Sequence, residues 1–305
     1  MNNDIYCGVD GGGTKSIVKC TDADGRTLAI AEFGAMNLNG SNVENCNQVI
    51  RDILNFCRDK AATLSKQIAV LVIGAAGISN PDAVTIIEAA ADQYGYLGKL
   101  ILVNDCEIAL QSAVGDEGII LIAGTGSVCA GRVAGGPMLR VGGYGHIFDD
   151  DGSSYALATE AFRAVVRAED GRGAPTLLSR LVFDRLQGNT TDLIRFCYSP
   201  YTTKRDIAAF APLLQQAIKA GDQVALDIEH QAAAELCLMA KTMIRRLGLV
   251  QPKVALAGGV LKNFSSLRKR LEQKLMTACP GVRIIPPGAE PVDGAIQIAL
   301  KHRSV

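Results

Sequence analysis

Two glycine-rich loops carry the residue types that are best suited to holding a phosphate group. The first reads Asp10-Gly11-Gly12-Gly13-Thr14-Lys15 and the second reads Ala123-Gly124-Thr125-Gly126-Ser127. Successive backbone N–H groups in such loops form an anion-binding nest, and glycine lets the backbone come close to the anion. A pair of tight turns with nothing bound is the plainer interpretation. Two matched loops that each end in a hydroxyl residue favour a bound triphosphate.

Both loops follow an apolar strand and lead into a second strand, so each is the turn of a hairpin. The preceding strands are expected at Ile5–Val9 and Ile119–Ala123. A P-loop would instead place Gly-Lys-Ser or Gly-Lys-Thr at the start of a helix, and a Rossmann fingerprint would also open a helix. The chain is therefore expected to bind phosphate in a different way from either fold.

The two hairpin units align when the first is shifted by 113 positions. Three pairs of residues then coincide: Gly11 with Gly124, Gly13 with Gly126, and Thr14 with Ser127. Asp10 falls on Ala123, so the two copies differ in a residue able to do chemistry. An internal repeat of this kind predicts two related lobes.

Strand and helix signals alternate along the rest of the chain, which is typical of α/β lobes. Apolar strands are expected at Ile68–Ile73 and Leu100–Val103, and a helix is expected from Cys106 to about Val114. No Pro/Gly-rich linker follows, so the boundary is predicted as a hinge that separates an N-terminal lobe, 1–114, from a C-terminal lobe, 115–305. For the last helix, which starts at Pro291, packing back on the first lobe is the alternative to packing within the C-terminal lobe.

The composition excludes several classes of partner. The 305 residues include 31 basic and 31 acidic side chains, so there is no polybasic footprint for nucleic acid or an anionic membrane. The longest apolar run, Ile68–Ile78, is half a membrane span, and no secretory signal is visible. Nine cysteines without a Cys-x-x-Cys pair indicate a reduced, cytoplasmic protein rather than disulfides or zinc, and the three histidines lack metal-ligand spacing.

Three motifs, in order along the chain, resemble the phosphate-1, phosphate-2 and adenosine motifs of the actin–hexokinase–Hsp70 ATPase superfamily. They are residues 10–16, residues 123–127 and Leu256-Ala257-Gly258-Gly259-Val260. Residues 142–146, followed by 150–153, resemble more narrowly the N-acetylglucosamine kinase branch that is grouped with the BadF/BadG ATPases. The resemblance implies two related ribonuclease H-like α/β lobes with a nucleotide cleft between them, ATP and Mg²⁺ as cofactors, and an amino sugar as substrate.

The resemblance also implies roles for two aspartates. Asp10 matches the residue that holds Mg²⁺ beside the β- and γ-phosphates, and a hard carboxylate oxygen suits that ion. An Asx-turn is the alternative role for Asp10. Asp105 matches the catalytic base that accepts the proton of the attacking sugar hydroxyl. Capping the helix from Cys106 is the alternative for Asp105, and both roles can hold together.

The remaining contacts are implied in the same way. The expected nucleotide contacts are Gly11, Gly12, Gly13, Thr14, Lys15, Gly124, Thr125, Gly126, Ser127, Gly258 and Gly259. The expected sugar contacts are Asn37, Asp105, Thr125, Gly143 and Asp150. A solvated acidic loop that caps the next helix is the alternative for Asp150. Asp149 and Asp151 replace the family's usual Gly and Glu, and Tyr144 stands where Trp is common, which leaves the identity of the amino sugar open.

The resulting hypothesis is an ATP-dependent kinase that converts N-acetylglucosamine to its 6-phosphate, and assembly into a homodimer is one option. Glucosamine and N-acetylmuramic acid are the alternative substrates. A BadF/BadG-type ATPase activator with an iron–sulfur cluster is disfavoured because the cysteines lie mostly in apolar strands and helices. A sugar sensor without turnover is disfavoured because both Asp10 and Asp105 are present.

Overall fold

The computed structural model describes residues 4–36, 43–78, 80–93, 95–96, 98–286 and 288–303. The chain divides into two compact units. Unit 1 comprises the residues up to Asp116 together with those after Pro286, and unit 2 comprises Glu117–Pro286. The predicted C-terminal lobe, 115–305, therefore differs from unit 2 at its end, because the last helix packs with the N-terminal part of the chain.

Unit 1 is built on a five-stranded mixed sheet. The order of its strands is β3 (Thr27–Phe33), β2 (Ser16–Thr21), β1 (Asp4–Gly11), β4 (Gln67–Ala75) and β5 (Lys99–Asn104). The β1–β2 and β2–β3 pairs are antiparallel, and β1, β4 and β5 are parallel.

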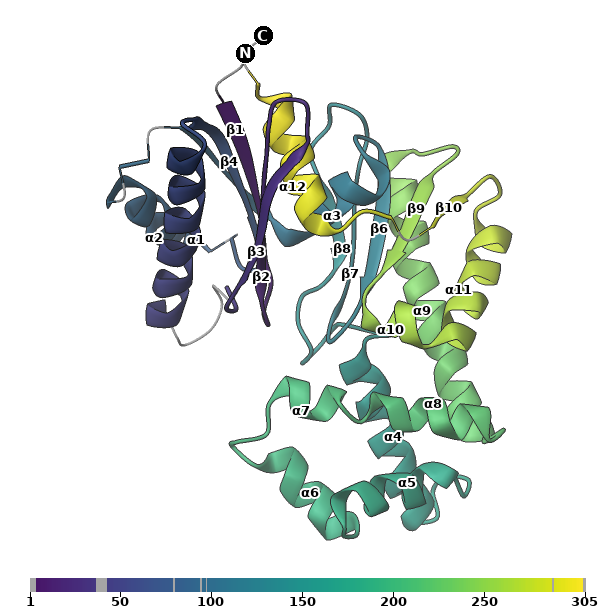
Figure 1. Ribbon diagram of the computed structural model, residues 1–305. Coiled ribbons are helices and arrows are strands. Elements are labelled where there is room, and N and C mark those ends of the chain that lie inside the picture. The colour runs from purple at the N-terminus through teal and green to yellow at the C-terminus, as the bar shows by residue number, and fades with distance from the viewer. Residues whose placement is uncertain are drawn as a thin grey trace. The chain divides into compact units, whose positions relative to one another are not determined.

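Helices cover both faces of this sheet (Figure 1). The helices of unit 1 are α1 (Val43–Thr63), α2 (Pro81–Gln93), α3 (Asp105–Val114) and α12 (Pro291–Lys301). Side chains alternate along β1, so Ile5, Cys7 and Val9 join the core beneath α1 and α2, whereas Tyr6 joins Ile108 and the α12 residues on the opposite face. The period-two pattern of β1 thus positions the loop at its end between two helical layers.

Unit 2 repeats the sheet order of unit 1. Its strands run β8 (Leu139–Gly142), β7 (Ser127–Arg132), β6 (Gly118–Ala123), β9 (Lys253–Ala257) and β10 (Arg283–Ile285). Antiparallel pairs join β6, β7 and β8, and parallel pairs join β6, β9 and β10. The prediction of two related α/β lobes is confirmed.

The alignment of the two hairpins within the repeat needs a correction. Gly11 pairs with Ser16 across the first hairpin, and Ala123 pairs with Ser127 across the second. Four residues lie between the first pair and three between the second, so Ser16, and not Thr14, corresponds to Ser127. On these ladder pairs the shift is 112 positions before the loop and 111 after it, so Gly11 falls on Ala123 and not on Gly124.

Unit 2 carries most of the helices, and Figure 1 shows α4–α8 grouped around one end of the long α9. The helices of unit 2 are α4 (Ser154–Glu169), α5 (Leu177–Leu186), α6 (Thr190–Tyr198), α7 (Lys204–Ala208), α8 (Ala211–Lys219), α9 (Gln223–Leu247), α10 (Gly259–Asn263) and α11 (Ser265–Ala278). Among the helices in the described part of the chain, none is long and apolar enough to cross a bilayer.

Capping residues explain where several of these helices begin and end. The sequence offers Ser153 or Ser154 as the start of a helix to about Glu169, and it is Ser153 that accepts a hydrogen bond from the N–H of Ala156 and caps α4. Gly248 ends α9 in the left-handed conformation, with φ of 64°. Asn263 was expected to cap a helix reaching Ala278, but it is the last residue of α10, and Phe264 separates α10 from α11.

Candidate functional site

In unit 1, the two predicted aspartates lie at the same edge of the sheet. Asp10 is the second-to-last residue of β1, and Asp105 is the first residue after β5. The strand register pairs Asp10 with Gly74 of β4, and Gly74 with Val103 of β5. Strands are spaced about 4.8 Å apart, so two strand spacings, about 10 Å, separate the backbones at Asp10 and Val103. Parallel strands thus bring both carboxylates to their carboxyl ends, where ligands bind in α/β sheets.

The electrostatics show that Asp10 lies in an anionic environment. Burial, together with the negative charges of Asp105 and Glu290, raises the pKa of Asp10 from 3.8 to about 6, and the positive charge of Lys15 opposes this rise. Burial also raises the pKa of Asp105, while the N–H of Cys106 opposes the rise. Burial and two neighbouring negative charges therefore disfavour the ionisation of Asp10 at this edge, an effect that a bound divalent cation would relieve.

The structure assigns the cap of α3 to a residue that the sequence analysis passed over. Asn104 has extended backbone angles, and its Oδ1 accepts a hydrogen bond from the N–H of Cys106 at 3.0 Å. Asp105 is the first residue of the helix, and its Oδ1 accepts from the same N–H at 2.9 Å. The alternative role of Asp105 as the N-cap is therefore wrong, because Asn104 occupies that position.

The first glycine loop is held at its base and exposed at its tip. The N–H of Gly12 donates to the carbonyl of Lys15 at 3.1 Å, and the N–H of Met36 donates to the carbonyl of Gly12 at 3.0 Å. Gly13 and Thr14 are exposed. The Nζ of Lys15 lies 2.7 Å from Glu32 Oε2, a contact that raises the pKa of Lys15. The exposed backbone of the loop is thus in a position to meet an anion.

In unit 2, the second glycine loop is tied to the segment that precedes α4. The N–H of Ser127 donates to Asp150 Oδ1 at 3.1 Å, and its hydroxyl donates to the carbonyl of Asp151 at 2.7 Å. The N–H of Ser154 donates to the carbonyl of Gly124 at 2.8 Å. The Ser127 hydroxyl, which was expected to contact phosphate, therefore has a backbone partner within its own unit.

Asp150 is buried and holds this loop in place. It adopts a left-handed conformation with φ of 69°, which is rare for a residue with a side chain. Its Oδ2 lies 2.6 Å from Lys204 Nζ, and only 3% of the residue is exposed. A Cβ on Gly126 would fall 2.8 Å from this carboxylate, so Asp150 also explains why a glycine stands there. The Asp150 carboxylate thus helps to fix the second loop, and its burial excludes the alternative of a solvated acidic side chain.

Close packing requires a glycine at the first of the two glycine positions in the adenosine motif. Gly258 has φ of 93°, and a Cβ there would collide with the backbone of Ala123 at the end of β6. Gly259 begins α10 on the side of Gly124, so the second loop and the adenosine motif are neighbours within unit 2. Gly143 has φ of 76°, and its added Cβ would lie 2.9 Å from Val128 Cβ.

The predicted residues therefore form two groups, one in each unit. Unit 1 brings together Asp10, Asp105 and residues 11–15, and unit 2 brings together residues 124–127, 143, 150, 258 and 259. Asn37 lies outside the described residues. His146, interpreted as structural, packs its ring edge-on against Tyr155 with the centroids 4.7 Å apart.

Sequence analysis missed two charged residues of these groups. Glu290 precedes α12, and only the return of that helix to unit 1 brings it near Asp10. Its neighbour Pro291 marks a helix start, but nothing in the sequence says where the helix packs. Lys204 lies 54 positions after Asp150, and a lysine at the start of a short helix carries no signal of a buried ion pair.

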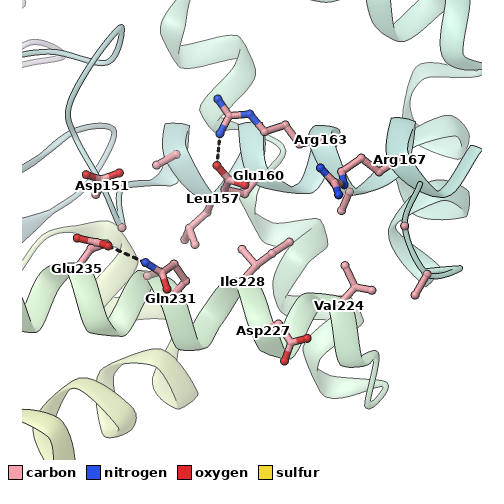
Figure 2. A pocket seen from close by; sticks show the side chains of 16 residues that line it. Asp151, Leu157, Glu160, Arg163, Arg167, Val224, Asp227, Ile228, Gln231 and Glu235 are labelled. Atoms are coloured by element: carbon pink, nitrogen blue, oxygen red, sulfur yellow. Dashed lines mark hydrogen bonds and ion pairs between the residues drawn. The ribbon is translucent and has the colours of Figure 1, made fainter. Parts of the chain in front are cut away.

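Figure 2 shows a separate cavity of about 570 Å³ between α4 and α9. Asp151 and Gly152 line it, but the glycine loops do not. Two pairs of its polar side chains interact, Arg163 with Glu160 and Gln231 with Glu235. The cavity thus lies beside the Asp150 segment without including the residues predicted to bind ligand.

Comparison with known proteins places the chain in a family. Residues 7–299 match the profile of the BadF/BadG/BcrA/BcrD ATPase family. The chain belongs to this family. Its sequence is 36% identical, over 296 residues, to the N-acetylmuramic acid/N-acetylglucosamine kinase of Clostridium acetobutylicum, covering 96% of this chain and 97% of the relative. It is 26% identical over 320 residues to the N-acetyl-D-glucosamine kinase of Dictyostelium discoideum, with 99% and 100% covered.

Solved structures agree with this family assignment. A candidate N-acetylglucosamine kinase from Chromobacterium violaceum superimposes with a TM-score of 0.77 and 26% identity, over 97% of this chain and 98% of the other. The ROK hexokinase of Thermus thermophilus has a TM-score of 0.59 and 17% identity, with 97% of each chain covered. The second comparison shows the shared fold alone, which is the two-lobed α/β fold of the actin–hexokinase–Hsp70 type.

Proposed function

We propose that this protein is an ATP-dependent kinase that transfers a phosphoryl group to a hydroxyl of an amino sugar. The observation that carries the proposal is the pair of aspartates in unit 1: Asp10 and Asp105 lie at one sheet edge, beside an exposed glycine loop, and both pKa values are raised. Phosphoryl transfer needs a site for a metal ion, a proton acceptor and a cradle for phosphate at one place.

N-acetylglucosamine is the substrate that we place first, with the 6-phosphate as product. The relatives support a hexose with an amino or N-acetyl group, since their names cover N-acetylglucosamine, N-acetylmuramic acid and glucosamine. A panel of these three sugars with N-acetylmannosamine and glucose, assayed by ADP release, distinguishes them by kcat/KM.

In this mechanism Asp105 accepts the proton of the attacking sugar hydroxyl as its oxygen bonds to the γ-phosphorus and the bond to the departing ADP oxygen breaks. Its raised pKa brings this carboxylate closer to the basicity that proton transfer requires. The exposed backbone at Gly13 and Thr14 in the first loop would hold phosphate, and the exposed backbone at Thr125 would do the same in the second loop. Gly258 and Gly259 would face the adenosine.

Mg²⁺ is the cofactor that we propose for unit 1. The donor set fits, because hard carboxylate oxygens suit Mg²⁺ and because Asp10 is held among other acidic groups with a raised pKa. When bound, the ion supplies charge neutralisation at the β- and γ-phosphates. We further propose a cytoplasmic location, supported by nine free cysteines, and a homodimer, which light scattering on the purified protein tests.

The decisive experiment compares Asp105→Asn with the unchanged protein in a coupled ADP-release assay. We expect kcat to fall by about 10²–10⁴-fold, because the proton acceptor is lost, while ATP affinity stays within a few-fold. Asp92→Asn, at an exposed position of α2, is the matched control and leaves kcat unchanged. Full sugar phosphorylation by Asp105→Asn would overturn the proposed function.

A further inference from the structure

Three cysteines from separate elements of unit 1 converge in its core. Cys7 lies in β1, Cys20 in β2 and Cys57 in α1, and each is 0% exposed. Their sulfur atoms lie within 4.8 Å of one another, and the sulfurs of Cys7 and Cys20 are 3.2 Å apart. These contacts do not involve the residues of the proposed kinase site.

The sequence pattern explains why the three sulfurs meet. Cys7 and Cys20 are direct cross-strand partners in the antiparallel β1–β2 pair, so their side chains point to the same face of the sheet. Cys57 follows Ile50, Ile53 and Leu54 on the buried stripe of α1, at helical spacing, and that stripe packs on the same face. The cluster is therefore fixed by three regular elements rather than by a loop.

The thiols of the cluster share hydrogen bonds that shift their pKa values. Hydrogen bonds from Cys57 and from Cys7 lower the pKa of Cys20, and the positive charge of Lys60 lowers it further. The pKa values of Cys7 and Cys57 are raised, chiefly through the hydrogen bond that each makes with Cys20. The three thiols therefore interact with one another in the core, and thiolate is the form that binds metals.

We propose that Cys7, Cys20 and Cys57 form a binding site for a soft monovalent metal ion, Cu(I), with three sulfur ligands. Soft thiolate ligands select Cu(I), Zn²⁺ and iron–sulfur clusters over hard ions. Zn²⁺ in structural sites takes four ligands, whereas no fourth His, Cys, Asp or Glu joins the three sulfurs among the described residues.

A cavity lies beside the part of α1 that carries Cys57, although none of the three cysteines lines it. The cavity has a volume of about 580 Å³, and Leu54, Arg58, Ala61 and Tyr96 are among its lining residues. The first three flank Cys57 on α1. Burial raises the pKa of Tyr96, and the charges of Cys7 and Cys57 add to this rise.

Ion binding would connect β1, β2 and α1 directly beneath the first glycine loop. That loop joins β1 to β2, and Cys7 lies three residues before Asp10 in β1. Because a ligand that binds only the folded state stabilises it, Cu(I) should raise the midpoint of thermal unfolding. Any second thiol that ionises on binding would release its proton to solvent.

The test is an anaerobic titration of the reduced, full-length protein with Cu(I) in competition with a chromophoric Cu(I) chelator. We expect one tightly bound equivalent per chain, and at least a tenfold loss of affinity in Cys20→Ala. Cys197→Ala in unit 2 is the matched control, because Cys197 lies outside the cluster, and it should bind Cu(I) as the unchanged protein does. Equal binding by Cys20→Ala, or tighter binding of Zn²⁺ than of Cu(I), would overturn the proposal.

A second measurement covers the outcome in which Cys20→Ala fails to fold. The unchanged protein is loaded with one equivalent of Cu(I), alkylated briefly under partly unfolding conditions, and mapped by mass spectrometry. Cys7, Cys20 and Cys57 should be protected together, relative to the metal-free protein, while the other six cysteines react equally in both. Protection of a different set would refute the site.

Discussion

Replacement of Asp10 by Asn should stabilise the metal-free protein while it abolishes activity. In the folded state, burial, Asp105 and Glu290 raise the pKa of Asp10 from 3.8 to about 6, a rise of about 2 units. Each unit corresponds to 1.36 kcal/mol, so ionised Asp10 costs the folded state about 3 kcal/mol. Asparagine has nearly the same shape and no charge, so it removes that cost.

The pH dependence of the free energy of unfolding follows from the raised pKa of Asp10. Between pH 4 and 6 the folded protein holds the Asp10 proton more tightly than the unfolded chain does, so the stability of the unchanged protein falls as pH rises. Above pH 6 the stability that protonated Asp10 contributes at lower pH is completely lost. The advantage of Asp10→Asn should therefore be near zero at pH 4, grow up to pH 6, and stay level at pH 7.5.

The assay is denaturant unfolding, followed by circular dichroism at pH 4, 5, 6 and 7.5 without divalent cations. Asp92→Asn, at an exposed position, serves as the control and should change the free energy of unfolding by less than about 0.5 kcal/mol at every pH. An Asp10→Asn variant that is no more stable than the unchanged protein at pH 7.5 would refute the electrostatic reasoning. So would an advantage that does not vary with pH.

Three further predictions concern neighbouring residues. Lys204→Met leaves the buried Asp150 carboxylate without its cation, and it should lower the free energy of unfolding by about 3 kcal/mol, whereas Lys219→Met on the exposed end of α8 should not. Gly258→Ala should reduce ATP affinity at least tenfold in a binding titration, because its Cβ collides with the backbone at the end of β6. Glu290→Gln removes one negative charge near Asp10 and should shift the pH dependence of unfolding to lower pH.

Local signals in the sequence predicted the parts of the fold that short-range forces decide. The start of α4 at Ser153 and the end of α9 at Gly248 follow from capping chemistry within a few residues. The apolar strands and the repeat of hairpins were equally readable, because alternation and glycine loops are local patterns. The family resemblance added the roles of the aspartates.

Long-range packing decided what the sequence did not reveal. The Asp150–Lys204 pair joins residues 54 positions apart. The approach of Glu290 to Asp10 depends on α12, which follows all of unit 2 in the sequence but belongs to unit 1. The Cys7–Cys20–Cys57 cluster likewise depends on strand register and on the seating of α1. Spacing along the chain carries none of this information.

The return of α12 to unit 1 has a consequence for how the protein is synthesised. The face of the β1–β5 sheet that holds Tyr6, Val70 and Val72 is completed by α12, which leaves the ribosome only after all of unit 2. Until then this apolar face has no cover from α12, so the nascent N-terminal segment is the part most exposed to aggregation or to chaperone capture. Ribosome-bound chains that end before Pro291 contain all of unit 2 but lack α12. They should therefore be more sensitive to protease than ribosome-bound chains that include α12.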